Sequence, residues 1–161
     1  MKKITNIYRL DFNSFLIVAK YFFKRLFKIS ISQNEKNFYS IYNSLIIYDG
    51  KIVESNHEYI VISLKINPKK IKLRVNDSSD FLVFNQIFRQ KEYLQLVNTY
   101  KKYHDTNKTI NIIDAGSNIG LTSLFFLDNF KKVKIVCLEP EKENFEILRY
   151  NLSNIRNSEI I

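Results

Sequence analysis

The chain has 161 residues, enough for one domain with a hydrophobic core, and 45% of them are hydrophobic, which argues against a disordered protein. The single cysteine excludes an internal disulfide. The formal net charge of +9 would suit nucleic acid, an anionic membrane or an acidic substrate. Because the basic residues are spread along the chain with no arginine-rich stretch, we favour a lysine-rich protein and expect no nucleic-acid partner.

The N-terminal segment predicts a helix that begins after Asp11, its N-cap, and runs to about Lys28. Seven apolar residues recur at helical spacing and are expected to pack on the domain: Phe12, Phe15, Leu16, Ala19, Phe22, Phe23 and Leu26. Basic residues crowd the second half, so contact of residues 11–28 with an anionic membrane surface is an alternative that we do not favour. Charged residues interrupt any signal-peptide core, and no apolar stretch is long enough to span a membrane. A cytoplasmic protein is therefore expected.

The segment from residue 32 to residue 103 predicts an α+β region. Ser32 and Glu35 fit a capping box for a short helix. Asp49-Gly50, flanked by two apolar runs, predicts a type I′ hairpin. Alternating apolar residues predict strands at residues 60–66 and 71–75, and helical spacing follows at 81–88 and 93–103. We place a boundary in the polar segment that follows, which gives an N-terminal region of residues 1–105 and a second part of residues 106–161.

A different pattern begins at Thr109. A β-branched run predicts a buried parallel strand up to Ile113, and the turn from Asp114 to Gly120 follows. A helix at residues 121–129, a strand at 133–138 and a helix at 141–152 complete two β–α units. This order is typical of the first half of a doubly wound nucleotide-binding sheet, so we expect an α/β fold here. Cys137 lies in the second strand and is interpreted as a buried structural thiol rather than a nucleophile.

The turn contains two of the three glycines in the chain. Gly116 can adopt backbone angles that other residues avoid and can let a ligand approach the main chain, and Gly120 lets the helix start pack tightly on the strand. Glu139 ends the next strand, where a carboxylate can accept hydrogen bonds from a ribose diol. The spacing is not that of a P-loop or of the dinucleotide fingerprint, so NAD is a minor alternative. A strand–glycine–helix turn without any ligand is the structural alternative.

The sequence from Ile112 to Thr122 resembles motif I of the FkbM-type methyltransferases. Residues 135–140 resemble the strand and ribose-binding acid that follow it, and Asn144-Phe145 with residues 148–152 resembles the next helix, which ends in Asn-Leu. A weaker match, at Arg74, Ser79-Asp80, Phe84 and residues 86–88, resembles the segment before motif I. The resemblance implies a class I methyltransferase fold that uses S-adenosylmethionine.

By matching position, the resemblance assigns cofactor binding to Asp114, Ala115, Gly116, Ser117, Asn118, Gly120 and Glu139. Among these, Asp114 and the two glycines would surround the methionine part, Asn118 would order the loop and Glu139 would hold the ribose. The family acts largely on hydroxyl groups of sugars and natural products, which makes a small molecule or glycan the expected acceptor. The resemblance assigns no catalytic base and no metal ligand.

The sequence after Thr109 accommodates two strands and, at residues 158–161, the start of a third, whereas a class I methyltransferase sheet has about seven. We therefore expect a partial Rossmann-like sheet and an N-terminal part of a methyltransferase. A separately encoded C-terminal half is the expected partner of such a chain. The alternative is a non-catalytic relic or an interaction module that pairs with another chain through the open sheet.

Overall fold

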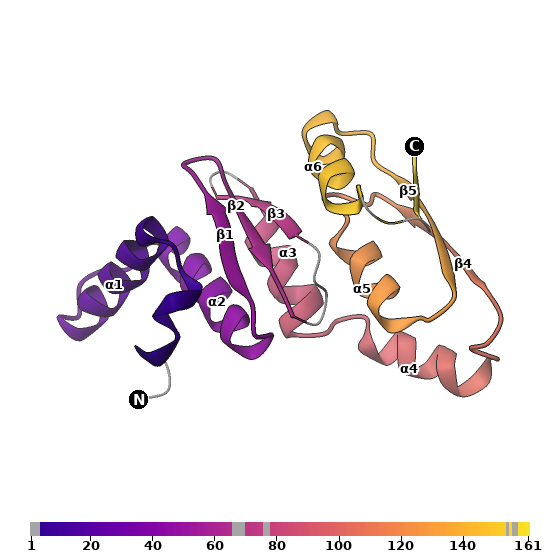
Figure 1. Cartoon of the computed structure of the whole chain (residues 1–161), viewed down its shortest axis with the longest axis horizontal. Helices are drawn as coiled ribbons and strands as arrows, with labels where there is room; N and C mark the ends of the chain where they lie inside the picture. The colour runs from indigo at the N-terminus through magenta and orange to yellow at the C-terminus, as the bar shows by residue number, and fades with distance from the viewer. Residues whose placement is uncertain (1–3, 66–69, 76–77, 154, 156–157) are drawn as a thin grey trace. The chain divides into compact units, whose positions relative to one another are not determined.

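The computed structural model describes residues 4–65, 70–75, 78–153, 155 and 158–161. The chain divides into two compact units, Met1–Asn85 and Gln86–Ile161 (Figure 1). Helix α4 (Leu94–Tyr103) belongs to the second unit, since the ring of Tyr100 lies 5.6 Å from that of Phe130. The division therefore falls after Asn85, whereas the polar composition of residues 101–108 had led us to expect it at residues 105 and 106.

The first unit joins helices to an antiparallel sheet of order β1-β2-β3. Its sheet confirms the two predicted strands, although residue 66 lies outside the described residues. Ile60, Ile62, Ile71 and Leu73 are buried in its core. The elements are η1 (Ile4–Arg9), α1 (Phe12–Leu26), α2 (Gln33–Ile47), β1 (Lys51–Ser55), β2 (Tyr59–Ser63), β3 (Lys70–Arg74) and α3 (Asp80–Phe84).

Helix α1 begins where the sequence predicted, because the side chain of Asp11 accepts a hydrogen bond from the Ser14 N–H. The predicted inward face, however, is wrong. Phe12, Phe23 and Leu26 are 74%, 57% and 77% exposed, and the buried residues of the helix are Ser14, Val18 and Tyr21. Helical spacing identifies residues that share a face, but it does not say which face the rest of the domain covers.

Asp49-Gly50 is the second correction, because it ends helix α2 instead of forming a hairpin turn. Asp49 has a φ of 50°, and the Gly50 N–H donates to the Leu45 carbonyl over 2.7 Å. This six-residue closure is a Schellman motif, which stops a helix with one residue in the left-handed region. Both motifs contain a left-handed residue, and here the helix that begins at the capping box of Ser32 and Glu35 continues into the run that resembled a strand.

The carboxylate of Glu35 connects α2 to α1. Its Oε1 lies 2.8 Å from Lys24 Nζ, and its Oε2 accepts the Ser32 N–H of the capping box over 2.9 Å. Lys24, together with that N–H, lowers the pKa of Glu35 from its usual 4.5 to about 2. The folded pKa is below the unfolded one, so this contribution to stability is present above pH 4.5 and is lost as the pH falls toward 2.

We expect a Glu35→Gln variant to melt at a lower temperature than the wild type at neutral pH, and the difference to shrink between pH 4.5 and pH 2. Thermal melts followed by circular dichroism across that range measure it. Glu58→Gln removes a carboxylate whose side chain is 72% exposed and is the matched control. A difference in melting temperature that stays constant over the range would contradict the assignment.

Buried Asp80 ties β3 to α3. Its side chain is 0% exposed, and its two oxygens accept hydrogen bonds from Arg74 Nε over 3.1 Å and from Arg74 Nη2 over 2.9 Å. Oδ2 also accepts the Arg74 backbone N–H over 2.8 Å. Two of the residues that carry the upstream family resemblance, Arg74 and Asp80, therefore form one structural pair within the first unit.

The second unit contains a parallel sheet of order β4-β5-β6, which confirms the α/β prediction for this part of the chain. Residues 158–160 form the third strand, as their position suggested. The remaining elements are the π-helical turn η2 (Asn85–Arg89), which begins at the unit boundary, β4 (Ile110–Ala115), α5 (Leu121–Asn129), β5 (Val133–Leu138), α6 (Lys142–Leu152) and β6 (Ser158–Ile160).

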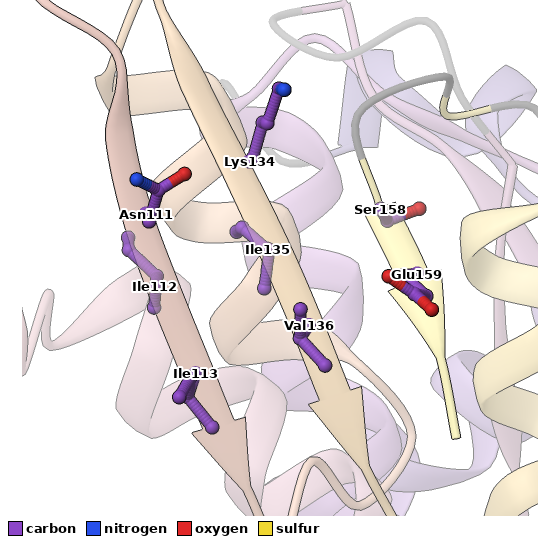
Figure 2. Close-up of a pocket in the computed structure, with 8 residues that line it drawn as sticks. All are labelled: Asn111, Ile112, Ile113, Lys134, Ile135, Val136, Ser158 and Glu159. Atoms are coloured by element: carbon purple, nitrogen blue, oxygen red, sulfur yellow. The ribbon is translucent and has the colours of Figure 1, made fainter.

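One face of this sheet is packed and the other is open. Ile135 and Cys137 are buried on the packed face, where α5 lies, whereas Ile113 on the opposite face is 73% exposed. A hollow of about 460 Å³ lies over the three strands. Its lining residues, drawn in Figure 2, are Asn111, Ile112, Ile113, Lys134, Ile135, Val136, Ser158 and Glu159. Parallel sheets are normally covered on both faces, so this surface is unusual for the architecture.

Candidate functional site

The turn after β4 is held in shape by left-handed backbone conformations and by the end of β5. Gly116, Asn118 and Gly120 have φ values of 81°, 49° and 83°. The N–H groups of Gly116 and Ser117 both donate to the Leu138 carbonyl, over 2.8 and 3.0 Å. Ser117 is buried, and its hydroxyl donates to the Asp114 carbonyl over 2.6 Å. The turn therefore lies at the carboxyl edge of the sheet, beside the end of the neighbouring strand.

Glu139 lies against this turn, as its place at the end of β5 predicted. Its Oε2 accepts the backbone N–H of Asn118 over 2.6 Å, and its Oε1 accepts the N–H of Glu141 over 3.0 Å. A carboxylate offers about four acceptor positions, so two backbone hydrogen bonds leave capacity for further donors. The two backbone donors also fix the orientation of the carboxylate.

The two glycines of the turn serve different purposes. A Cβ added at Gly116 would meet no atom within 4 Å, so this position is open on its outer side. At Gly120 the same Cβ would lie 2.7 Å from Leu148 Cδ1, a side chain of α6. Gly120 thus permits close packing of the loop on a helix, whereas we had expected it to let the helix start pack on the strand. Gly116 is the glycine that leaves the main chain accessible.

Asn118 carries a buried acceptor that lacks a donor. Its side-chain Oδ1 is buried and has no hydrogen-bond partner among the described residues. Leaving such a group unsatisfied costs on the order of 1–3 kcal/mol, which native proteins usually avoid. The contact that orders the loop comes from the backbone N–H of Asn118, through Glu139. The amide oxygen is therefore suited to a donor supplied by a bound molecule.

The carboxylate of Asp114 is hydrogen-bonded to helix α5. Its Oδ2 accepts the hydroxyl of Ser123 over 2.6 Å, and that hydroxyl also lies 3.2 Å from Cys137 Sγ. Ser123 and Cys137 are both 0% exposed, and burial raises the pKa of the Cys137 thiol. This confirms that the cysteine is buried, and it gives Asp114 a structural contact that fixes the start of the turn.

Two contributors to the site were not anticipated. Ser123 binds Asp114, and the side-chain amide of Asn151 donates to the Ile119 carbonyl over 2.8 Å from the end of α6. Asn151 is 3% exposed, and it is the asparagine of the Asn-Leu pair that closes the helix. That pair was the only sequence signal that could have identified it. Of the seven predicted cofactor-binding residues, Ala115 and Gly116 are exposed. None of the seven lines the hollow in Figure 2.

No family model and no curated protein matches the chain. Among solved structures, the chain is similar to a SAM-dependent methyltransferase from Agrobacterium tumefaciens, with 14% sequence identity and a TM-score of 0.48. The match covers 68% of this chain and 33% of that structure. The chain therefore spans about a third of the length of that protein.

Proposed function

We propose that the turn from Asp114 to Gly120 binds S-adenosylmethionine and that the chain is part of a methyltransferase. The observation that carries this proposal is the carboxylate of Glu139, which is oriented by the Asn118 N–H at 2.6 Å beside the open backbone of Gly116. An acid at the end of the second strand, next to a glycine turn after the first, is the arrangement that binds a nucleoside ribose in doubly wound folds.

The residues of the turn suit the chemical groups of this cofactor. The remaining acceptor capacity of Glu139 matches the two hydroxyls of a ribose. The buried Oδ1 of Asn118 needs a donor, which the amino group of the methionine part can supply. Gly116 leaves room for the ligand at the main chain. Hydrogen bonds of Ser117 to the Asp114 carbonyl and of Ser123 to the Asp114 carboxylate stabilise the turn. When bound, S-adenosylmethionine supplies an electrophilic methyl group for transfer to a nucleophile.

The proposed acceptor is a hydroxyl group of a sugar or natural product. Support for this class comes from the resemblance of the sequence around Asp114 to the FkbM-type motif, and we assign no catalytic base. We further propose that a separately encoded C-terminal half completes the sheet. The exposed Ile113 and the hollow between β4, β5 and β6 are the surface that such a segment would cover.

A second candidate function, an interaction module without catalysis, is favoured by the same surface. Ile113, Val136 and Glu159 are paired across the three strands, so the open face presents a continuous row with two apolar side chains. A chain that pairs through this face needs no cofactor. The two functions therefore differ in whether the glycine turn binds S-adenosylmethionine.

Titration calorimetry of the full chain with S-adenosylmethionine tests the proposal. We expect binding, and we expect Glu139→Gln to weaken it roughly tenfold or more, since a hydrogen bond to a charged group is worth about 1.5–3 kcal/mol. Glu146→Gln is the matched control, because this α6 carboxylate is 59% exposed and forms an ion pair with Arg149 at 3.8 Å. It should leave the affinity unchanged.

Binding that is equal in all three proteins would show that the ligand does not use the carboxylate of Glu139. No binding, together with a stable complex formed through the open sheet face, would replace the methyltransferase proposal by the interaction module. Transfer of an isotope-labelled methyl group to a hydroxylated acceptor, in the presence of the complementing segment, tests the reaction itself.

A further inference from the structure

Helix α1 presents its apolar side to solvent. Phe12, Leu16, Phe23 and Leu26 are between 49% and 77% exposed, and at about 100° per residue they lie within an arc of roughly 80°. Phe27 extends the same surface at the end of the helix, where its ring centroid lies 4.5 Å from that of Phe23. These five residues are called the α1 apolar face below. An exposed apolar cluster of this kind usually marks a contact surface.

The opposite side of α1 makes the contacts with the rest of its unit. Tyr21 stacks on Tyr39 of α2 with ring centroids 4.1 Å apart, and Lys24 forms the ion pair with Glu35. Ser14 and Val18 are buried on that side as well. The helix is therefore anchored through a partly polar surface, and its most hydrophobic surface is not used for packing within the first unit.

The charge around the α1 apolar face is positive. Residues 1–30 contain seven lysines and arginines and one acidic residue, Asp11. Arg9 is paired with Asp49 and Lys24 with Glu35. Lys20 borders the face and lies 3.8 Å from the same Glu35, with its side chain 65% exposed, and the exposed Arg25 and Lys28 lie at the C-terminal end of the helix. An exposed Phe- and Leu-rich face beside basic residues is the pattern of a helix that lies in a membrane interface.

We propose that α1 docks on the surface of an anionic lipid bilayer, with the α1 apolar face inserted at the level of the headgroups and Lys20, Arg25 and Lys28 contacting anionic lipids. Charge complementarity favours this occupant over a second copy of the chain, which would bring the same basic residues together. Within the described residues, no helix has the length and apolarity needed to cross a bilayer. The proposal is therefore surface attachment and is independent of the function proposed for the glycine turn.

The absence of tryptophan from the sequence allows a site-specific test. Leu26→Trp places a single fluorophore on the α1 apolar face, and Leu96→Trp, at a position that is 59% exposed on α4, is the matched control. With vesicles of phosphatidylcholine and phosphatidylserine, we expect the emission of Leu26→Trp to shift to the blue and to be quenched by brominated lipids. The emission of Leu96→Trp should not change.

Vesicle sedimentation of the full chain tests the proposed contact between the basic residues of α1 and anionic lipids. The triple variant Lys20→Gln, Arg25→Gln, Lys28→Gln should lose roughly a hundredfold in partitioning to anionic vesicles, at about 1 kcal/mol per basic residue. Lys131→Gln, Lys132→Gln, Lys134→Gln removes the same charge from the second unit and should lose much less. Equal losses in the two triple variants, or equal quenching at positions 26 and 96, would overturn the proposal. A lipid-independent blue shift that grows with protein concentration would overturn it in favour of a second copy.

Discussion

Replacing Asp80 with alanine is expected to reduce the free energy of unfolding of the first unit by about 3–5 kcal/mol. The carboxylate is 0% exposed and accepts three hydrogen bonds from Arg74, one of them from its backbone N–H. Alanine removes all three hydrogen bonds that this fully buried carboxylate accepts from Arg74, whose side chain is 23% exposed. Losing the buried member of such a pair is more costly than losing an exposed pair. Equilibrium unfolding in urea, followed by circular dichroism, measures the loss.

The control for this prediction is Glu58→Ala, which removes a carboxylate whose side chain is 72% exposed in the same unit. Its effect should remain within about 0.5 kcal/mol. Asp80→Asn retains the shape and two acceptor lone pairs, so we expect a loss between those of the alanine variant and the control. A loss below about 1 kcal/mol for Asp80→Ala would show that the pair with Arg74 contributes little to the stability of this unit.

The second large effect is expected at Gly120. Gly120→Ala should destabilise the second unit by about 2–4 kcal/mol, because a non-glycine residue is strained in the left-handed region and the new Cβ overpacks the helix interface. The φ of this residue is 83°, and the Cβ would lie 2.7 Å from Leu148 Cδ1. Thermal and urea unfolding of the second unit measure the change.

Gly116→Ala is the matched control, since φ is 81° there but a Cβ would have no neighbour within 4 Å. Gly116→Ala should therefore lower the free energy of unfolding of the second unit by only the backbone strain, about 1 kcal/mol. Gly116→Val should in addition abolish binding of S-adenosylmethionine, because its branched side chain fills the open side of the turn. Equal destabilisation by alanine at positions 116 and 120 would contradict the contact between Gly120 and α6.

The glycine turn could be predicted because its sequence admits few other structures. A β-branched run, two glycines four residues apart and an acid after the next apolar run require a strand, a left-handed turn and a second parallel strand. In the structure, the Asn118 N–H donates to Glu139 Oε2 over 2.6 Å, as this order of elements predicts. Ser123 and Asn151 could not be foreseen, because their hydrogen bonds to the turn depend on where helices α5 and α6 pack.

The errors in the first unit have a common physical origin. The period of apolar residues in α1 was identified correctly, but period says nothing about direction, and Tyr21 with Lys24 determines which side contacts α2. The type I′ turn predicted at Asp49-Gly50 needs left-handed backbone angles at both residues, and the structure has them at Asp49 alone. A helix end needs one such residue and a type I′ hairpin needs two, and the choice depended on how far α2 extends.

The burial of Cys137 also makes the chain its own stability probe. This lone thiol sits in the middle of the parallel sheet, covered by Ser123 of α5, and its raised pKa keeps it protonated at neutral pH. Because the thiolate is the reactive form, an alkylating reagent can modify it only when β5 and α5 separate. The alkylation rate therefore measures how often this part of the second unit opens, and it needs no added label and no unfolding agent.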